Sequence, residues 1–224
     1  MSFHVSKAAA LFSLVALVAA ALPAAAQTAD PMSAANIYLY PRPYKIQNLV
    51  LKDSAGRHAS LADFAGRVVL LHFWSIQCPA CRTEEPLLEA LKKAFGPGGL
   101  EILAVNLIDP PGSVASHAAR NRLPFPILFD GGNGFSIRPV RTGGKQTAFL
   151  INPAQEAILE IPALPTTYII DCRGNAIGYS VGAAQWNHRK AVELIQSLVL
   201  QSKNCQADGP ARVSALPSSY RQLW

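Results

Sequence analysis

The feature that most constrains this chain is an apolar segment that runs into a pair of cysteines and then into a helical pattern. Residues 68–74 form an almost continuous apolar run, which predicts a buried β-strand. After a short link, Cys78-Pro79-Ala80-Cys81 opens the helical pattern. Proline suits the first turn of a helix, where its missing N–H has no partner and its φ is already helical. We therefore expect Cys78 to lie at a helix N-terminus.

This position favours redox chemistry at the two sulfurs. The free N–H groups and the dipole of a helix N-terminus stabilise a thiolate, which is the reactive form of cysteine. Cys81 follows one turn later, within bonding distance of Cys78, so the pair can cycle between dithiol and disulfide. The alternative is a purely structural bridge. A bridge across two residues closes a very short loop and removes little chain entropy, so it stabilises poorly.

The N-terminal segment, residues 1–26, has the pattern of a Sec-type signal peptide. A weakly basic start with His4 and Lys7 precedes an apolar run at 8–21, and an A-x-A pattern ends at Ala26. The alternative is an uncleaved membrane anchor within residues 8–26, but the apolar run is shorter than the roughly 20 residues that a span requires. We expect export to the periplasm, where cysteines meet an oxidising environment.

Composition narrows the function class further. The chain has 224 residues, of which 50% are hydrophobic, and a formal net charge of +6. This is enough for one domain with its own core and no structural metal. The basic residues are spread along the chain and are not interleaved with aromatic ones, which argues against nucleic-acid binding.

The order of the expected elements indicates an α/β domain between two extensions. We expect an irregular N-terminal arm at 27–45, a domain at 46–202 and a polar C-terminal tail at 203–224. A strand, a helix and a second strand in sequence imply parallel neighbours with a right-handed crossover. The expected elements are strands at 67–74, 100–108 and 125–129, helices at 79–95, 113–121 and 187–201, an insertion at about 131–161, and a β-hairpin at 163–181.

Two segments compete for the hairpin of the core, because residues 147–152 resemble residues 166–171. Each is followed by a turn and then by Ala-Ile. We assign the second to the core because Pro165 immediately precedes it. The first is then an inserted hairpin that extends or covers an edge of the sheet.

With these motifs in order, the chain resembles thioredoxin-fold proteins, and more closely the exported TlpA/ResA-like thiol–disulfide oxidoreductases. The resemblance covers roughly residues 46–200 and implies a central mixed β-sheet flanked by helices. In this chain we expect that fold to be extended at the N-terminus and to carry an insertion before the cis-proline hairpin. The matching residues are Phe73, Trp74, Cys78, Pro79, Ala80, Cys81, Arg82, Glu84, Pro86, Leu164, Pro165, Thr166, Thr167, Ile170, Asp171 and Gly174.

The resemblance implies roles for these residues. Cys78 and Cys81 would be the catalytic pair, and Glu84 would tune their protonation, although it could also be an ordinary helix-face carboxylate. Pro165 would follow a cis peptide bond beside the sulfurs, the alternative being a trans proline that opens a strand. The residues expected to contact a substrate are Trp74, Pro79, Ala80, Leu164 and Thr166.

Three further residues near the motif invite interpretation. Glu85 is expected to face solvent. His72 stands where thioredoxins carry a buried carboxylate, so it could relay a proton or be a hydrogen-bonded structural histidine. Gln77 replaces an aromatic residue that many relatives have before the first cysteine, which alters the surface that meets a partner.

The other two cysteines are expected to form a structural disulfide in the thioredoxin arrangement. Cys172 lies in the turn of the core hairpin, and Cys205 follows the last helix, whose end approaches that turn. Closing a loop of about 34 residues would stabilise the fold by roughly 3–4 kcal/mol in the chain-entropy treatment. The alternative is a free Cys205 in the tail.

The resulting hypothesis is a periplasmic reductant of disulfides in client proteins of the cytochrome c maturation or copper-site assembly type. Such a protein would need no cofactor beyond its redox-active disulfide, and a membrane thiol donor would reduce it again. We expect it to act as a monomer and not to bind nucleic acid. The alternatives are a disulfide oxidase or isomerase, a copper-binding module, and a thiol peroxidase. The copper-binding module would use Cys78 and Cys81 with His72 or His188 as a third ligand. The peroxidase lacks a visible peroxide pocket.

Overall fold

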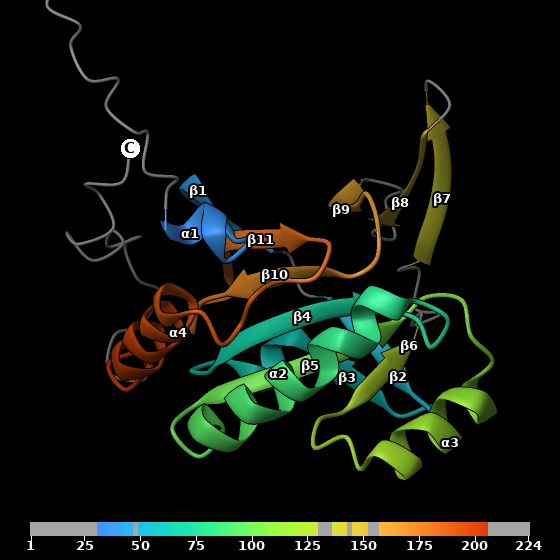
Figure 1. Cartoon of the computed structure of the whole chain (residues 1–224), viewed down its shortest axis with the longest axis horizontal. Helices are drawn as coiled ribbons and strands as arrows, with labels where there is room; N and C mark the ends of the chain where they lie inside the picture. The colour runs from blue at the N-terminus through green and yellow to red at the C-terminus, as the bar shows by residue number, and fades with distance from the viewer. Residues whose placement is uncertain (1–30, 47–48, 130–135, 143–144, 152–156, 206–224) are drawn as a thin grey trace, which may run out of the picture.

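The fold combines a large mixed sheet with a small antiparallel one (Figure 1). The computed structural model describes residues 31–46, 49–129, 136–142, 145–151 and 157–205. The signal peptide prediction and most of the predicted tail lie outside these residues. Within the described part, the large sheet has eight strands in the order β1-β11-β10-β4-β5-β6-β2-β3, and the small sheet has three in the order β7-β8-β9.

The element bounds follow the expected order closely in the middle of the chain. The strands of the large sheet are β1 (Tyr38–Lys45), β2 (Val50–Asp53), β3 (His58–Ser60), β4 (Val68–Trp74), β5 (Leu100–Asn106), β6 (Ile127–Phe129), β10 (Thr166–Ile170) and β11 (Asn175–Val181). The small sheet comprises β7 (Ser136–Thr142), β8 (Lys145–Ile151) and β9 (Ala157–Ile161). The helices are α1 (Pro31–Ala34), the 3-10 turn η1 (Leu61–Phe64), α2 (Pro79–Phe95), α3 (Pro111–Asn121) and α4 (Arg189–Ser202).

Strand β4 is the centre of the architecture, and every residue in it is buried. It pairs in parallel with β5 and antiparallel with β10. The parallel pairing confirms the strand–helix–strand prediction, since α2 supplies the crossover between β4 and β5. Because successive side chains of a strand alternate between faces, β4 contributes to two separate cores.

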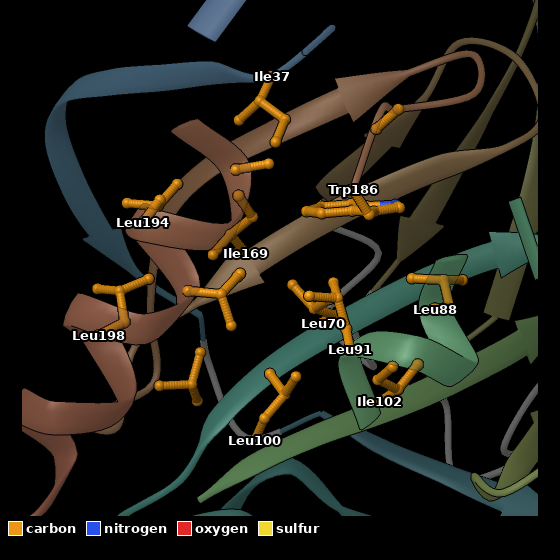
Figure 2. Close-up of a cluster of buried hydrophobic side chains, with 14 of the residues drawn as sticks. Ile37, Leu70, Leu88, Leu91, Leu100, Ile102, Ile169, Trp186, Leu194 and Leu198 are labelled. Atoms are coloured by element: carbon orange, nitrogen blue, oxygen red, sulfur yellow. The ribbon is translucent and has the colours of Figure 1, made fainter. Parts of the chain in front are cut away.

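The first core lies between the sheet and helices α2 and α4. Figure 2 shows Leu88 and Leu91 from α2, and Leu194 and Leu198 from α4, in one cluster with Trp186 and the sheet residues. The apolar positions of both helices recur at helical spacing, which is why one face of each helix is buried. The sheet residues in this cluster include Leu70, Leu100, Ile102 and Ile169.

The second core lies on the opposite face of the sheet and is covered by the insertion. Leu150 of β8 and Leu159 and Ile161 of β9 are buried in one cluster with Leu71 and Phe73 of β4. The insertion was expected to be a hairpin at a sheet edge. It is instead a three-stranded sheet that packs on a face, because the apolar side chains of β4 and β5 on that side need cover.

The prediction of an irregular N-terminal arm is wrong for residues 38–45. These residues form β1, an edge strand that pairs antiparallel with β11 and has a register shift between Leu39 and Tyr44. Proline is tolerated in edge strands and at bulges, so the intervening prolines do not prevent pairing. Tyr40 packs on Tyr179 of β11, with ring centroids 5.2 Å apart, and so ties the strand to the sheet.

Candidate active site

The two cysteines of the motif sit where the sequence predicts, at the start of α2. Cys78 is the N-cap residue, and Pro79 occupies the first turn. Cys78 and Cys81 form a disulfide with their Cα atoms 5.2 Å apart. The Sγ of Cys78 also accepts a hydrogen bond from the backbone N–H of Cys81 at 3.1 Å. Cys78 is partly exposed whereas Cys81 is fully buried. Of the two residues, Cys78 is therefore the one that a partner protein can reach.

The loop before β10 lies at the same edge of the sheet. The Leu164–Pro165 peptide bond is cis, as the resemblance implies. Thr166 pairs with Phe73, so Pro165 lies beside the carboxyl end of β4, from which the link to Cys78 departs. The carbonyl of Pro165 accepts a hydrogen bond from the N–H of Gly182 at 2.8 Å, which fixes the loop. Leu164 and Cys78 pack against the same apolar cluster.

Glu84 is fully buried, so it is not an ordinary carboxylate on the exposed face of the helix. Its carboxylate accepts hydrogen bonds from the indole N–H of Trp186 and, at 3.4 Å, from the backbone N–H of Ala184. Burial raises the pKa of Glu84 to about 7, and the two hydrogen bonds oppose this rise only in part. Oε2 has no hydrogen-bond partner among the described residues. Such a carboxyl can exchange a proton near neutral pH one helical turn from Cys81.

His72 is a buried, neutral residue on the helix-facing side of β4. Its Nδ1 lies 2.9 Å from the hydroxyl of Thr167, its neighbour across the β4–β10 ladder. Burial lowers the pKa of His72 to about 3. Within the described part of the chain its Nε2 has no partner, and neither does the hydroxyl of Ser180, which pairs with Thr167 on β11. The hydrogen-bonded structural reading of His72 therefore has direct support.

Glu85 was expected to face solvent, and this prediction is wrong. Glu85 is buried, and its Oε1 lies 2.9 Å from Nε2 of His117 on α3. The imidazole of His117 in turn packs on Trp74, with ring centroids 5.5 Å apart. The helical pattern of α2 alone could not reveal this burial, because it depends on the side chain that α3 brings alongside.

A cluster of polar groups that the sequence interpretation missed fixes the link before Cys78. Asp109 Oδ2 accepts hydrogen bonds from the backbone N–H of Ile76 and from the side chain of Asn106, both at 2.8 Å. The hydroxyl of Ser75 also hydrogen-bonds the Asp109 carboxylate. Burial opposes ionisation of Asp109, but these hydrogen bonds and the nearby His117 outweigh it and hold the pKa below its ordinary value. We call Ser75, Asn106 and Asp109 the carboxylate clamp.

The expected substrate contacts divide into exposed and buried groups. Pro79 is exposed, and Ala80 and Leu164 are partly exposed, so these three are available to a partner. Trp74 is only 2% exposed, and Thr166 is fully buried and donates its hydroxyl proton to the carbonyl of Ala163. The side chains of Trp74 and Thr166 therefore lie beneath the surface, and their predicted contact with a substrate stays a prediction.

Comparison with known proteins agrees with this geometry. The profile of the AhpC/TSA family matches residues 44–177, more than half of the chain. This chain belongs to the AhpC/TSA family. It is also similar to curated proteins named thiol-disulfide oxidoreductase ResA. The protein from Halalkalibacterium halodurans is 36% identical over 115 residues, covering 50% of this chain and 62% of the relative. The protein from Bacillus subtilis is 29% identical over 127 residues, covering 55% and 68%.

Solved structures place this AhpC/TSA-family member in the thioredoxin-like fold. A putative thiol:disulfide interchange protein DsbE from Chlorobium tepidum superposes with a TM-score of 0.54 at 21% identity, covering 70% of this chain and 97% of that one. A secreted thiol-disulfide isomerase from Corynebacterium glutamicum gives 0.56 at 18% identity, covering 73% and 92%. The chain spans less than two thirds of the length of the first of the curated ResA relatives, at 62%.

The remaining cysteines of this AhpC/TSA-family chain are brought together at the other end of the sheet. Cys172 follows β10 and Cys205 follows α4, and the structure joins them in a disulfide with Cα atoms 6.2 Å apart. The backbone carbonyl of Cys172 accepts a hydrogen bond from Gly66, just before β4 begins. This pair is thus separated from Cys78 and Cys81 by the length of β4.

His72 and His188, the histidines that the copper-binding alternative would use, have other partners in the structure. Across the described ranges, no group of three or more His, Cys, Asp or Glu side chains is placed to hold a metal ion. His188 caps the N-terminus of α4 through Nδ1, and His72 bonds Thr167. None of the helices in the described residues is long and apolar enough to cross a membrane.

Proposed function

We propose that this AhpC/TSA-family chain is an exported thiol–disulfide oxidoreductase that reduces disulfides in client proteins. One observation carries the proposal: Cys78 is the partly exposed N-cap of α2, and its Sγ accepts the N–H of a fully buried Cys81. The same N–H and the helix dipole would stabilise a Cys78 thiolate in the reduced protein. The names of the ResA relatives support this reaction class.

The reaction is a two-step exchange between dithiol and disulfide. The Cys78 thiolate attacks one sulfur of a client disulfide, forms a mixed disulfide and releases the other client sulfur as a thiolate. Cys81 then loses its proton and attacks Cys78, which expels the second client thiolate. The client gains two electrons, and the protein is left with the Cys78–Cys81 disulfide. A second dithiol must reduce that disulfide to complete the cycle.

Glu84 is the group best placed to take the proton from Cys81. It lies one turn along α2, it is buried, and its pKa of about 7 allows it to be ionised in a substantial fraction of molecules at neutral pH. Its free Oε2 is the atom that would accept the proton, either directly or through a water molecule. In this proposal Glu84 acts on the resolving step and not on the initial attack.

The direction of electron flow depends on the reduction potential of the pair. A strongly oxidising value of about −120 mV would favour a disulfide oxidase, whereas a value near −270 mV would favour a reductant. Equilibrium with glutathione, followed by alkylation of free thiols, measures this potential. We expect a reducing value, and an oxidising one would move the proposal to the oxidase alternative, which uses the same residues.

Substitution of Cys78 tests the reaction itself. We expect Cys78→Ser to abolish the acceleration that the protein gives to the reduction of insulin by dithiothreitol. The matched control is the double variant Cys172→Ser and Cys205→Ser, which removes the same number of potential disulfides and should retain the activity. If Cys78→Ser keeps full activity, the proposal is wrong. Metal analysis of the reduced protein tests the copper alternative, which requires tight stoichiometric copper.

The proposal includes a location and two classes of partner. The signal-like residues 1–26 and the secreted isomerase among the structural relatives support export. The resemblance to TlpA/ResA-like proteins supports clients involved in cytochrome c maturation or copper-site assembly. It also supports re-reduction by a membrane-embedded thiol donor. Fractionation of cells that express the full chain tests the location, with the periplasm as the expected compartment.

A further inference from the structure

Ile108 is an apolar side chain held in solvent close to the redox pair. It is 71% exposed, against 56% for Leu200, 46% for Tyr38 and 38% for Tyr44. Single exposed apolar residues are common on protein surfaces, so exposure alone carries little meaning. Two further features suggest that Ile108 contacts a partner: its place in the fold and the way in which its loop is held.

The residues on both sides of Ile108 are hydrogen-bonded to the link that leads into Cys78, Leu107 through its backbone and Asp109 through its carboxylate. On one side, the N–H of Leu107 donates to the carbonyl of Trp74 at 3.2 Å. On the other side, Asp109 accepts the N–H of Ile76 at 2.8 Å. The two segments therefore run side by side, and Ile108 stands next to the turn that enters α2.

The carboxylate clamp holds the loop that carries Ile108 in one conformation. The side chain of Asn106 donates to Asp109 Oδ2 at 2.8 Å and accepts the backbone N–H of Asp109 at 2.9 Å, so it closes the loop around Ile108. Pro110 and Pro111 follow directly and restrict the backbone further. Because its backbone is already held, this loop loses little freedom when a partner covers Ile108, which favours its use as a contact.

The surroundings of Ile108 are largely apolar. Ile76 is partly exposed, and Pro79, Pro110 and Pro111 are exposed, while Gln77 is the exposed polar side chain of the link itself. The guanidinium of Arg82 borders it and donates to the carbonyl of Ile76 at 3.3 Å. This arrangement suits an apolar side chain of an incoming chain better than a charged one.

We propose that Ile108 is a specificity-determining contact that selects protein disulfides with an apolar residue next to the attacked cysteine. The proposal rests on the proposed thiol–disulfide exchange and names the substrate class of that same site. The occupant is the client segment itself, because a client bonded to Cys78 is brought next to the link that Leu107 and Asp109 hold beside Ile108. Transient redox encounters lie at the low end of interface sizes, so a few apolar contacts beside the attacked disulfide are enough for the partner that we propose.

Two disulfide peptides and a small disulfide provide the test. The peptides differ only in the residue next to the attacked cysteine, which is leucine in one and serine in the other. The small disulfide is 5,5′-dithiobis(2-nitrobenzoate), which reports the reactivity of Cys78 without a peptide contact. The reduced full-length protein is mixed with each, and saturation curves separate the maximal rate from the half-saturating concentration.

We expect the wild-type protein to favour the leucine peptide about tenfold over the serine peptide, through a lower half-saturating concentration. Ile108→Ser should abolish this preference and leave the rate with the small disulfide unchanged, and Ile108→Leu should restore the preference. Leu200→Ser is the matched control, since Leu200 is an apolar residue of α4 that is 56% exposed. It should behave as the wild type with all three substrates.

The outcomes separate this inference from the proposed function. If the wild type reduces neither peptide nor the small disulfide, the proposed function fails. If the wild type reduces both peptides equally, or if Ile108→Ser keeps the preference, the inference is overturned and the function stands. Equal slowing of all three substrates by Ile108→Ser would also overturn it, because Ile108 would then act only in holding the loop.

Discussion

The carboxylate of Glu84 on α2 accepts a hydrogen bond from the indole N–H of Trp186, in the segment that precedes α4. This bond connects the helix that begins with the redox pair to the segment that leads into α4, the second helix of the same layer. Figure 2 shows Trp186 among side chains of α2, α4 and the sheet, so the carboxylate meets its partner within an apolar cluster. The raised pKa of Glu84 follows from this burial.

The first prediction concerns the pH dependence of stability. The pKa of Glu84 is raised to about 7 in the folded protein, from an ordinary value of 4.5. Between these pH values the folded state holds a proton that the unfolded state has lost, so the free energy of unfolding falls as the pH rises. The difference corresponds to about 3 kcal/mol, since one pKa unit is worth about 1.4 kcal/mol. Glu84→Gln, which keeps an acceptor for Trp186, should remove this fall.

Urea unfolding at a series of pH values measures the effect. The control is Glu89→Gln, which lies on the same helix and is not among the buried residues. It should leave the pH profile unchanged. A profile of Glu84→Gln that is parallel to that of the wild type between pH 4.5 and 7 would contradict the prediction.

The second prediction concerns His72 and has the opposite sign. Burial lowers the pKa of His72 from 6.5 to about 3, so the unfolded state binds a proton in this range that the folded state does not. The free energy of unfolding therefore falls as the pH drops from 6.5 towards 3. His72→Asn should lower stability at neutral pH but lose less on acidification. In the wild type the effects of Glu84 and His72 oppose each other between pH 4.5 and 6.5, and the two single variants should separate them.

The central part of the fold was predictable because local patterns and tertiary structure agree there. The apolar run of β4, the proline at the start of α2 and the period of α4 each specify one element without help from distant residues. Pro165 ahead of β10 was likewise enough to choose between two similar strands. In all these cases the prediction rests on residues close together in the sequence, and the structure forms the predicted element.

The elements that were missed depend on contacts between distant segments. β1 contains prolines that argue against a strand, and only its edge position beside β11 makes the pairing possible. Glu85 lies next to Glu84 in sequence, and its burial follows from His117 on α3. Asn106 and Asp109 could have been suspected, because polar residues just beyond the carboxyl ends of parallel strands often form sites. No local pattern links them to Ile76.

The third prediction concerns Asp109 as a positioning residue. Asp109→Ala removes the acceptor of the Ile76 N–H and should lower the free energy of unfolding by about 1.5–3 kcal/mol, the usual contribution of a hydrogen bond to a charged group. Asp109→Asn keeps an acceptor but removes a negative charge near Cys78. We expect it to lower the pKa of the Cys78 thiol while costing less stability, because the charge disfavours a thiolate.

Titration of the reduced protein by thiolate absorbance or by the rate of iodoacetamide labelling measures this pKa. The matched control is Asp53→Asn, since Asp53 also accepts backbone N–H groups, from Ala55 and Arg57, in the turn between β2 and β3. It should leave the thiol pKa unchanged. An unchanged thiol pKa in Asp109→Asn would limit Asp109 to a structural role.

The fourth prediction concerns the disulfide between Cys172 and Cys205. The bond closes a loop with a sequence separation of 33, and its loss should lower the free energy of unfolding by about 3–4 kcal/mol in the chain-entropy treatment. The double variant Cys172→Ser and Cys205→Ser should nevertheless keep the reduction potential of Cys78–Cys81, because β4 separates the two pairs. Denaturant unfolding and glutathione equilibration measure these quantities. Peptide mapping of the unreduced wild type provides the direct check, and two free thiols at these positions would contradict the pairing.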